Sequence, residues 1–132
     1  MKIKRLFTME GESPYASIEF EKRASVIRNP DGSIVSKWDN VSVPKHWSQV
    51  ATDILAQKYF RKSGIPKHLK SAKEKGIPDW LQPSLYDKAK DDQEISEADS
   101  SAVDTTVSET DAREVFHRLA GCWTYWGYKH NY

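Results

Sequence analysis

Apolar and polar residues alternate from residue 18 to residue 28, which is the pattern of a half-buried strand. The next four residues, Asn29-Pro30-Asp31-Gly32, combine a fixed φ at proline with a glycine that tolerates a chain reversal. Residues 33–38 then read as a return strand, so the sequence predicts a β-hairpin. The alternation puts an apolar set on one face of the first strand and a polar set on the other: Ile18, Phe20, Ala24 and Val26 against Glu19, Glu21, Arg23 and Ser25.

A helical pattern follows the breaker Pro44. Apolar residues recur at spacings of three and four, which gathers them into one stripe along a helix from about residue 45 to residue 62. Gly64 and Pro66 form a stop signal after it. The predicted stripe comprises Trp47, Val50, Ala51, Ile54, Leu55 and Tyr59.

A second amphipathic helix is predicted after residue 108, with Ser108 or Thr110 as its cap. Five large aromatic residues follow within ten positions, and so much apolar surface favours packing against another part of a fold. We therefore expect the next part of the fold to lie outside this chain. The stripe is Ala112, Val115, Phe116, Leu119, Ala120 and Trp123, and the aromatic residues are Trp123, Tyr125, Trp126, Tyr128 and Tyr132.

The segment between the two helices changes from basic to acidic. Residues 61–75 carry six Lys or Arg residues and one acid, whereas residues 91–111 carry eight acids and no Lys or Arg. The acidic part is typical of a flexible, solvated insertion. The pattern predicts a mainly helical α+β fold, organised as a hairpin segment (1–42), an amphipathic helix (43–64), an irregular insertion (65–107) and a helix with an aromatic tail (108–132). Together these form one incomplete domain.

Composition and charge exclude several classes of function. The net charge is +1 over 132 residues, so no overall basic field points to nucleic acid or anionic membranes. No apolar run approaches the ~20 residues of a membrane span, and nothing resembles a secretory leader. Cys122 is a single cysteine, which excludes an internal disulfide and a multi-cysteine metal site. These features predict a soluble cytoplasmic protein.

The sequence contains only weak matches to catalytic or metal-binding motifs. Glu114 and His117 have the Glu-x-x-His spacing of di-iron helices, but no second such motif occurs, so a surface pair is favoured. His117 and Cys122 would lie roughly 140° apart around a helix, too far to act together. His46, His68 and His130 stand alone, and no catalytic, cofactor-binding or metal-ligating residue is assigned. The candidates are packing or interface residues: Trp47, Ile54, Leu55, Val115, Phe116, Leu119, Trp123 and Trp126.

Two long strings resemble a known family. Residues 43–62 (VPKHWSQVATDILAQKYFRK) and residues 109–127 (ETDAREVFHRLAGCWTYWG) resemble the amino-terminal region of adenosylcobalamin-dependent, class II ribonucleotide reductases. The opening through residues 27–32 (IRNPDG) is similar to the start of the same family. The resemblance is weakest across residues 71–107.

The resemblance implies an activity that lies elsewhere in a longer chain. Such enzymes reduce ribonucleotides, here expected to be ribonucleoside diphosphates, on a ten-stranded α/β barrel that follows this region and is absent here. Adenosylcobalamin generates a thiyl radical on a barrel cysteine, and a thioredoxin-like reductant recharges a cysteine pair. This chain, with one cysteine, would be an inactive scaffolding segment. Its expected partners are the rest of the reductase and, for the full enzyme, substrate and reductant, with a homodimer left open.

Two alternatives remain at this point. A non-enzymatic interaction module would bind another protein through the aromatic face of residues 115–128. A single-stranded nucleic-acid binder would combine the basic segment at residues 61–75 with the aromatic tail, and it is the less favoured of the two.

Overall fold

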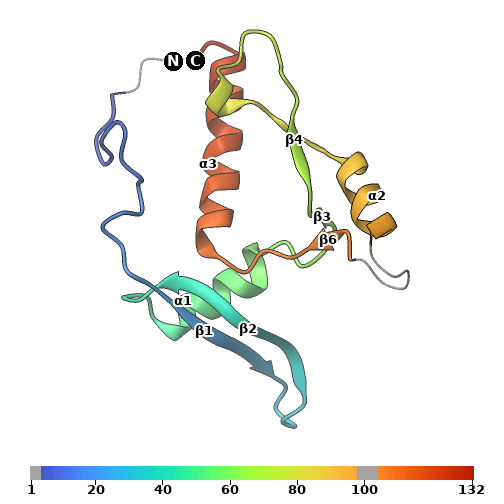
Figure 1. The fold of residues 1–132 in the computed structure, drawn as a ribbon. Coiled ribbons are helices and arrows are strands. Elements are labelled where there is room, and N and C mark those ends of the chain that lie inside the picture. The colour runs from blue at the N-terminus through green and yellow to red at the C-terminus, as the bar shows by residue number, and fades with distance from the viewer. Residues whose placement is uncertain (1–3, 98–103) are drawn as a thin grey trace. The chain divides into compact units, whose positions relative to one another are not determined.

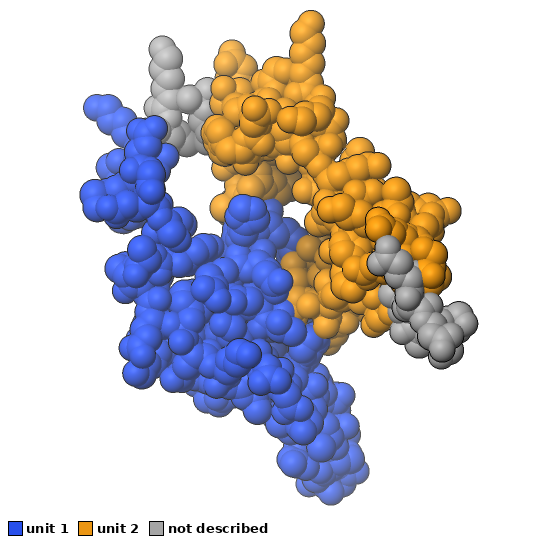
Figure 2. Space-filling model, viewed as in Figure 1, with its two compact units in different colours: residues 1–60, 110–118 blue, residues 61–109, 119–132 orange. Residues whose placement is uncertain are grey.

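The computed structural model describes residues 4–97 and 104–132, which form two compact units (Figures 1 and 2). Unit 1 contains residues 1–60 and 110–118, and unit 2 contains residues 61–109 and 119–132. The central part of the acidic segment, including Asp99, lies outside the described residues. Each unit is therefore built from two stretches that are distant in sequence.

The predicted hairpin is present in unit 1. Strands β1 (Phe20–Arg28) and β2 (Ile34–Pro44) pair antiparallel. The Asp31 carboxylate closes the turn by accepting hydrogen bonds from the Ser33 amide (2.9 Å) and hydroxyl (2.6 Å). Gly32 supplies the positive φ of 86° that this reversal requires.

A bulge in β2 decides which side chains face inward. Arg23 pairs with Val41, but Ser25 pairs with Trp38, so β2 contains one more residue than β1 across this step. Asn40 takes a φ of 62°, a conformation that asparagine tolerates better than most residues. The extra residue shifts the alternation by one position, and it brings Trp38 to the same side as the buried Val41 and Val43.

The predicted inward face of β1 was wrong. Ser25 is buried and Arg23 half-buried, whereas Ala24 and Val26 are exposed. The polar face turns inward because its groups have partners on the next helix: the Ser25 hydroxyl donates to Asp53 at 2.7 Å. The alternation along β1 was predicted correctly, but the face that was expected to be buried is the exposed one.

The first helix is shorter than predicted and changes type. Helix α1 (Gln49–Ile54) begins after Ser48, whose hydroxyl accepts the Ala51 amide at 3.1 Å. It continues as a π-helical turn, η1 (Leu55–Tyr59), closed by a hydrogen bond from the Phe60 amide to the Leu55 carbonyl (3.2 Å). The core of unit 1 joins this helix to β2 and to the first turn of the last helix: Val41, Val43, Thr52, Leu55, Ala56, Phe60, Ala112 and Val115 are buried.

Helix α3 (Ala112–Lys129) confirms the second predicted helix, but Asp111, not Ser108 or Thr110, caps it. The Asp111 carboxylate accepts the Arg113 amide at 2.8 Å. Glu114 reaches back and accepts the Asp111 amide at 3.0 Å, completing a reciprocal capping box. This start is fixed to the hairpin because the Ser42 amide donates to the Thr110 carbonyl at 2.8 Å.

The region predicted as irregular forms several short elements in unit 2. Strands β3 (Ile65–Pro66) and β6 (Thr106–Val107) pair, as do β4 (Leu69–Ser71) and β5 (Ser84–Tyr86). A 3₁₀ turn, η2 (Asp79–Leu81), and helix α2 (Lys88–Glu97) complete the set. The acidic segment is thus partly helical. The mixed α+β class is confirmed, but a helical predominance is not.

None of the helices in the described ranges, 4–97 and 104–132, combines the length and apolar character needed to cross a bilayer.

Candidate functional site

Arg23 fastens helix α1 to the hairpin in unit 1. Its guanidinium donates to three acceptors across this junction, the carbonyls of Trp47 (2.6 Å) and Lys45 (2.8 Å) and the Thr52 hydroxyl (3.2 Å). It also pairs with Glu21 at 2.6 Å. A planar, multidentate cation suits this junction because it satisfies carbonyls that precede the helix and lack strand partners.

The structure separates the eight predicted packing residues into core and surface. Leu55 and Val115 belong to the core of unit 1. Trp47 and Leu119 are half-buried, and Trp47 packs edge-on against the Phe116 ring at 6.1 Å between centroids. The remaining four are exposed by about half: Ile54 (51%), Phe116 (42%), Trp123 (64%) and Trp126 (54%).

Four of these residues lie along one side of α3. Successive helical residues are about 100° apart, so Phe116, Leu119, Trp123 and Trp126 fall within about 80° of one another around the helix. We call this set the α3 stripe. Two exposed tryptophans one turn apart are unusual on a solvated helix and are typical of a protein-binding surface.

Another side of α3, about 120° around the helix from the α3 stripe, is held by contacts within unit 2. The Tyr125 hydroxyl donates to Glu74, and the Lys129 ammonium donates to Glu74 at 2.8 Å and to the Tyr125 hydroxyl at 2.9 Å. Hydrogen bonds from Lys129 and then Tyr125 lower the pKa of Glu74, and the Glu74 contact raises the pKa of Lys129. This network holds the last turns of α3 in place within unit 2.

Acid should release this network. Because the pKa of Glu74 is lower in the folded chain than its ordinary value, its contribution is present above that ordinary value, about 4.3, and is lost as pH falls through the folded value. We expect Glu74→Gln to destabilise the chain at pH 6 and to have little effect at pH 3, measured by urea unfolding. Glu12→Gln, an exposed acid, is the control. An equal effect of Glu74→Gln at both pH values would contradict this account.

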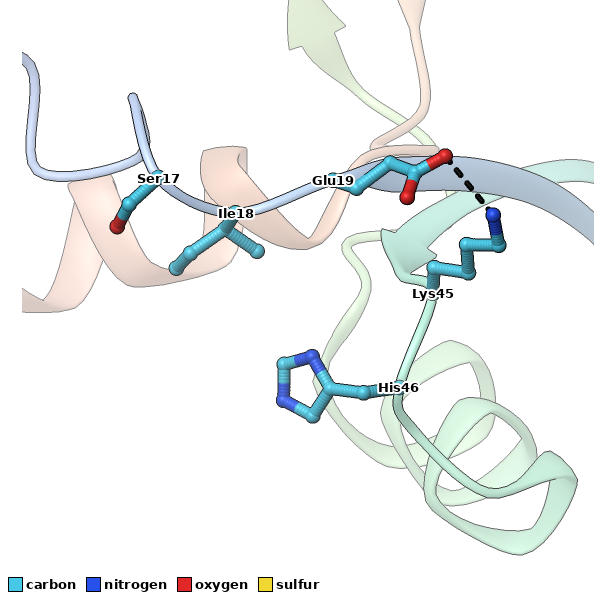
Figure 3. Close-up of a pocket in the computed structure, with 5 residues that line it drawn as sticks. All are labelled: Ser17, Ile18, Glu19, Lys45 and His46. Carbon is cyan, nitrogen blue, oxygen red and sulfur yellow. Dashed lines mark hydrogen bonds and ion pairs between the residues drawn. The ribbon is translucent and has the colours of Figure 1, made fainter.

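A small hollow lies in unit 1 beside the start of β1. Ser17, Ile18, Glu19, Lys45 and His46 line its volume of about 260 Å³, with the Glu19–Lys45 ion pair (2.9 Å) on its rim (Figure 3). The volume is below the range of about 300–1,000 Å³ typical of small-molecule sites, and a corrinoid is larger than drug-sized ligands. The hollow therefore does not fit a cobalamin.

Within the described residues, no group of three or more His, Cys, Asp or Glu side chains is placed to hold a metal ion. Glu114 acts as the capping acceptor of α3, which explains its spacing from His117 without a metal. His117 is exposed and Cys122 half-buried. The chemistry that these residues support is packing and hydrogen bonding.

The acidic segment forms ion pairs with part of the basic one. The Glu109 carboxylate is buried and accepts both the backbone amide and the Nε of Arg61 at 2.9 Å. Glu94 on α2 pairs with Lys67 at 2.7 Å and with His68 at 2.7 Å. These pairs engage two of the six Lys and Arg residues of the basic segment, Arg61 and Lys67, which a phosphate backbone would otherwise compete for.

Comparison with known proteins gives one consistent family. The sequence profile described as "Class II vitamin B12-dependent ribonucleotide reductase" matches residues 21–132. The chain is 51% identical over all 132 residues to a vitamin B12-dependent ribonucleotide reductase of Bradyrhizobium diazoefficiens and 52% identical to one of Agrobacterium fabrum. It is 34% identical over 76 residues, 56% of the chain, to one of Streptomyces coelicolor, covering 8% of that protein. The chain spans about a tenth (10%) of the length of the first two relatives.

Proposed function

Because the chain belongs to the class II vitamin B12-dependent ribonucleotide reductase family, we propose that it is the amino-terminal scaffolding segment of such a reductase. The complete enzyme would reduce ribonucleoside diphosphates to deoxyribonucleotides in the cytoplasm. Adenosylcobalamin, substrate and a thioredoxin-like reductant would bind outside this segment, which would be inactive alone. A radical thiol and a dithiol pair need three cysteines, and this chain has one.

The exposed α3 stripe carries the proposal. Its Trp123 and Trp126 side chains are 64% and 54% exposed, yet the helix beneath them is capped at Asp111 and held by the Glu74 network. A preorganised aromatic surface loses little conformational entropy on docking, which makes it suited to rigid packing. Of the eight candidates, Leu55 and Val115 would act by stabilising the segment itself, and the exposed ones by contacting the rest of the reductase.

A double variant tests this role. We expect Trp123→Ser with Trp126→Ser to weaken association of the chain with the separately expressed remainder of the reductase by roughly a hundredfold, because central tryptophans contribute most to interface energy. The fold should persist, since both side chains are largely exposed. Trp80→Ser, which removes a tryptophan that is 73% exposed on η2, is the matched control. Unchanged affinity in the double variant, measured by calorimetry, would contradict docking through the stripe.

The same surface could serve an independent interaction module. Tight binding to an unrelated protein, together with no binding to the remainder of the reductase, would favour the interaction-module alternative. Matches at 51% and 52% identity over all 132 residues of the chain, which cover 10% of each reductase, favour the scaffolding role.

A further inference from the structure

Unit 1 carries a second apolar surface, on the first helix. Three large side chains are exposed there: Val50 (66%), Ile54 (51%) and Tyr59 (53%). The sequence pattern puts them in the same stripe as the residues that build the core. The structure instead buries Thr52, Leu55 and Ala56 on the other side and leaves these three in solvent.

The π turn aligns the three exposed residues. In an α-helix, Val50 and Ile54 are neighbours because residue i+4 lies over residue i, but Tyr59 would be about 140° away from Ile54. In a π turn the hydrogen bond runs from residue i+5 to residue i, and the Phe60-to-Leu55 bond (3.2 Å) has this form. Residue i+5 then lies nearly over residue i, which places Tyr59 above Ile54. We call Val50, Ile54 and Tyr59 the α1 strip.

The position of Tyr59 is also held from α3. Arg118 donates to the Tyr59 carbonyl at 2.9 Å, and Phe60, the next residue, is buried and packs edge-on against Trp38 at 5.7 Å. The backbone at the end of the π turn is therefore fixed, while the Tyr59 side chain remains outside. Helical π turns cost regular hydrogen bonding and occur frequently at functional positions.

We propose that the α1 strip is a second docking surface, separate from the α3 stripe, and that its occupant is an apolar face of the following part of the same reductase chain. The inference rests on the proposed function. Relatives that match all 132 residues are about ten times as long, since this chain covers 10% of them. Most of the family's polypeptide is thus available to cover a surface on this segment.

The small area of the α1 strip favours this occupant over a second copy of the chain. A stable interface between separate proteins buries about 800 Å² per partner, which three side chains do not supply. A covalently connected partner is present at a high effective concentration, so a small apolar strip is enough to fix its position. Two small surfaces, one on the first helix and one on α3, would also give the segment two points of attachment to the larger body.

Oxidative footprinting of the complete reductase, compared with the 132-residue chain, tests the inference. In the short chain, hydroxyl radicals should modify Val50, Ile54 and Tyr59. In the complete reductase their modification should fall to the level of the buried Leu55 and Phe60. Ile54→Asn should lower the thermal unfolding midpoint of the complete reductase more than that of the short chain, with Lys58→Asn, an exposed neighbour, as control.

The outcomes separate the two proposals. If Trp123 and Trp126 are protected in the complete reductase and the α1 strip is not, the second surface is wrong and the scaffolding role stands. If neither set is protected, both proposals fail. Protection of the α1 strip that appears in the short chain as its concentration rises would assign the surface to a second copy and overturn the proposed occupant.

Discussion

Replacing Arg23 with methionine is expected to lower the free energy of unfolding of the chain by about 3 kcal/mol. The change removes charged hydrogen bonds to the carbonyls of Trp47 and Lys45 and to the Thr52 hydroxyl. Methionine keeps an unbranched apolar stem in place of the arginine stem, so its packing is largely retained and the loss mainly reports the hydrogen bonds. Because the lost contacts join β1 to the start of α1, amides of residues 48–56 should also exchange faster with solvent.

Lys22→Met is the matched control for Arg23. Lys22 is the preceding residue on β1, carries the same charge and is exposed. Denaturant unfolding of both variants, followed by tryptophan fluorescence, separates loss of charge from loss of the junction. Equal destabilisation by the two substitutions would show that Arg23 does not fasten the helix.

Replacing Glu109 with alanine is expected to cost about 2 kcal/mol and to loosen residues 61–109 as a group. The buried carboxylate accepts two hydrogen bonds from Arg61, and the Glu109 amide donates to the Arg61 carbonyl at 2.9 Å. Arg61 and Glu109 therefore close the two ends of a stretch whose own sheets are only two or three residues long. The Arg61 side chain is half exposed, so water compensates part of the loss.

Hydrogen exchange across β3–β6 and β4–β5 measures this loosening. Asp92→Ala, which removes an exposed acid from α2, controls for the change in net charge. Exchange that increases only next to residue 109, with β4 and β5 unchanged, would mean that the Arg61–Glu109 contact does not hold the stretch together.

Local chemistry predicted the hairpin, its turn and both amphipathic helices. The turn at residues 29–32 acts over a few residues, so sequence alone finds it. The cap of the second helix was predicted at Ser108 or Thr110, but it is Asp111. The β1 face was assigned to the wrong side because Arg23 and Ser25 are stabilised by partners more than 20 residues away. Such partners are not visible in a periodic pattern.

For the candidate docking surface too, local spacing was predicted from sequence and long-range contacts were not. The sequence placed Phe116, Leu119 and Trp123 in one apolar stripe and named Trp126 as an interface candidate, since helical spacing fixes which residues share a side. It did not distinguish Leu55, which is core, from Ile54, which is exposed, because adjacent apolar residues about 100° apart both fit one wide stripe. The acidic segment was predicted as solvated, but Glu94 and Glu109 find cations in the preceding basic segment. The sequence signal for this pairing is the succession of two oppositely charged runs, at residues 61–75 and 91–111.

The most direct test of the scaffolding account is a ribonucleotide-reduction assay with adenosylcobalamin and a dithiol. It would compare the 132-residue chain, the separately expressed remainder of the reductase, and a mixture of the two. The account predicts no deoxyribonucleotide from the chain alone, and stable association with restored activity in the mixture. Deoxyribonucleotide formation by the chain alone, or full activity of the remainder without any association, would contradict it.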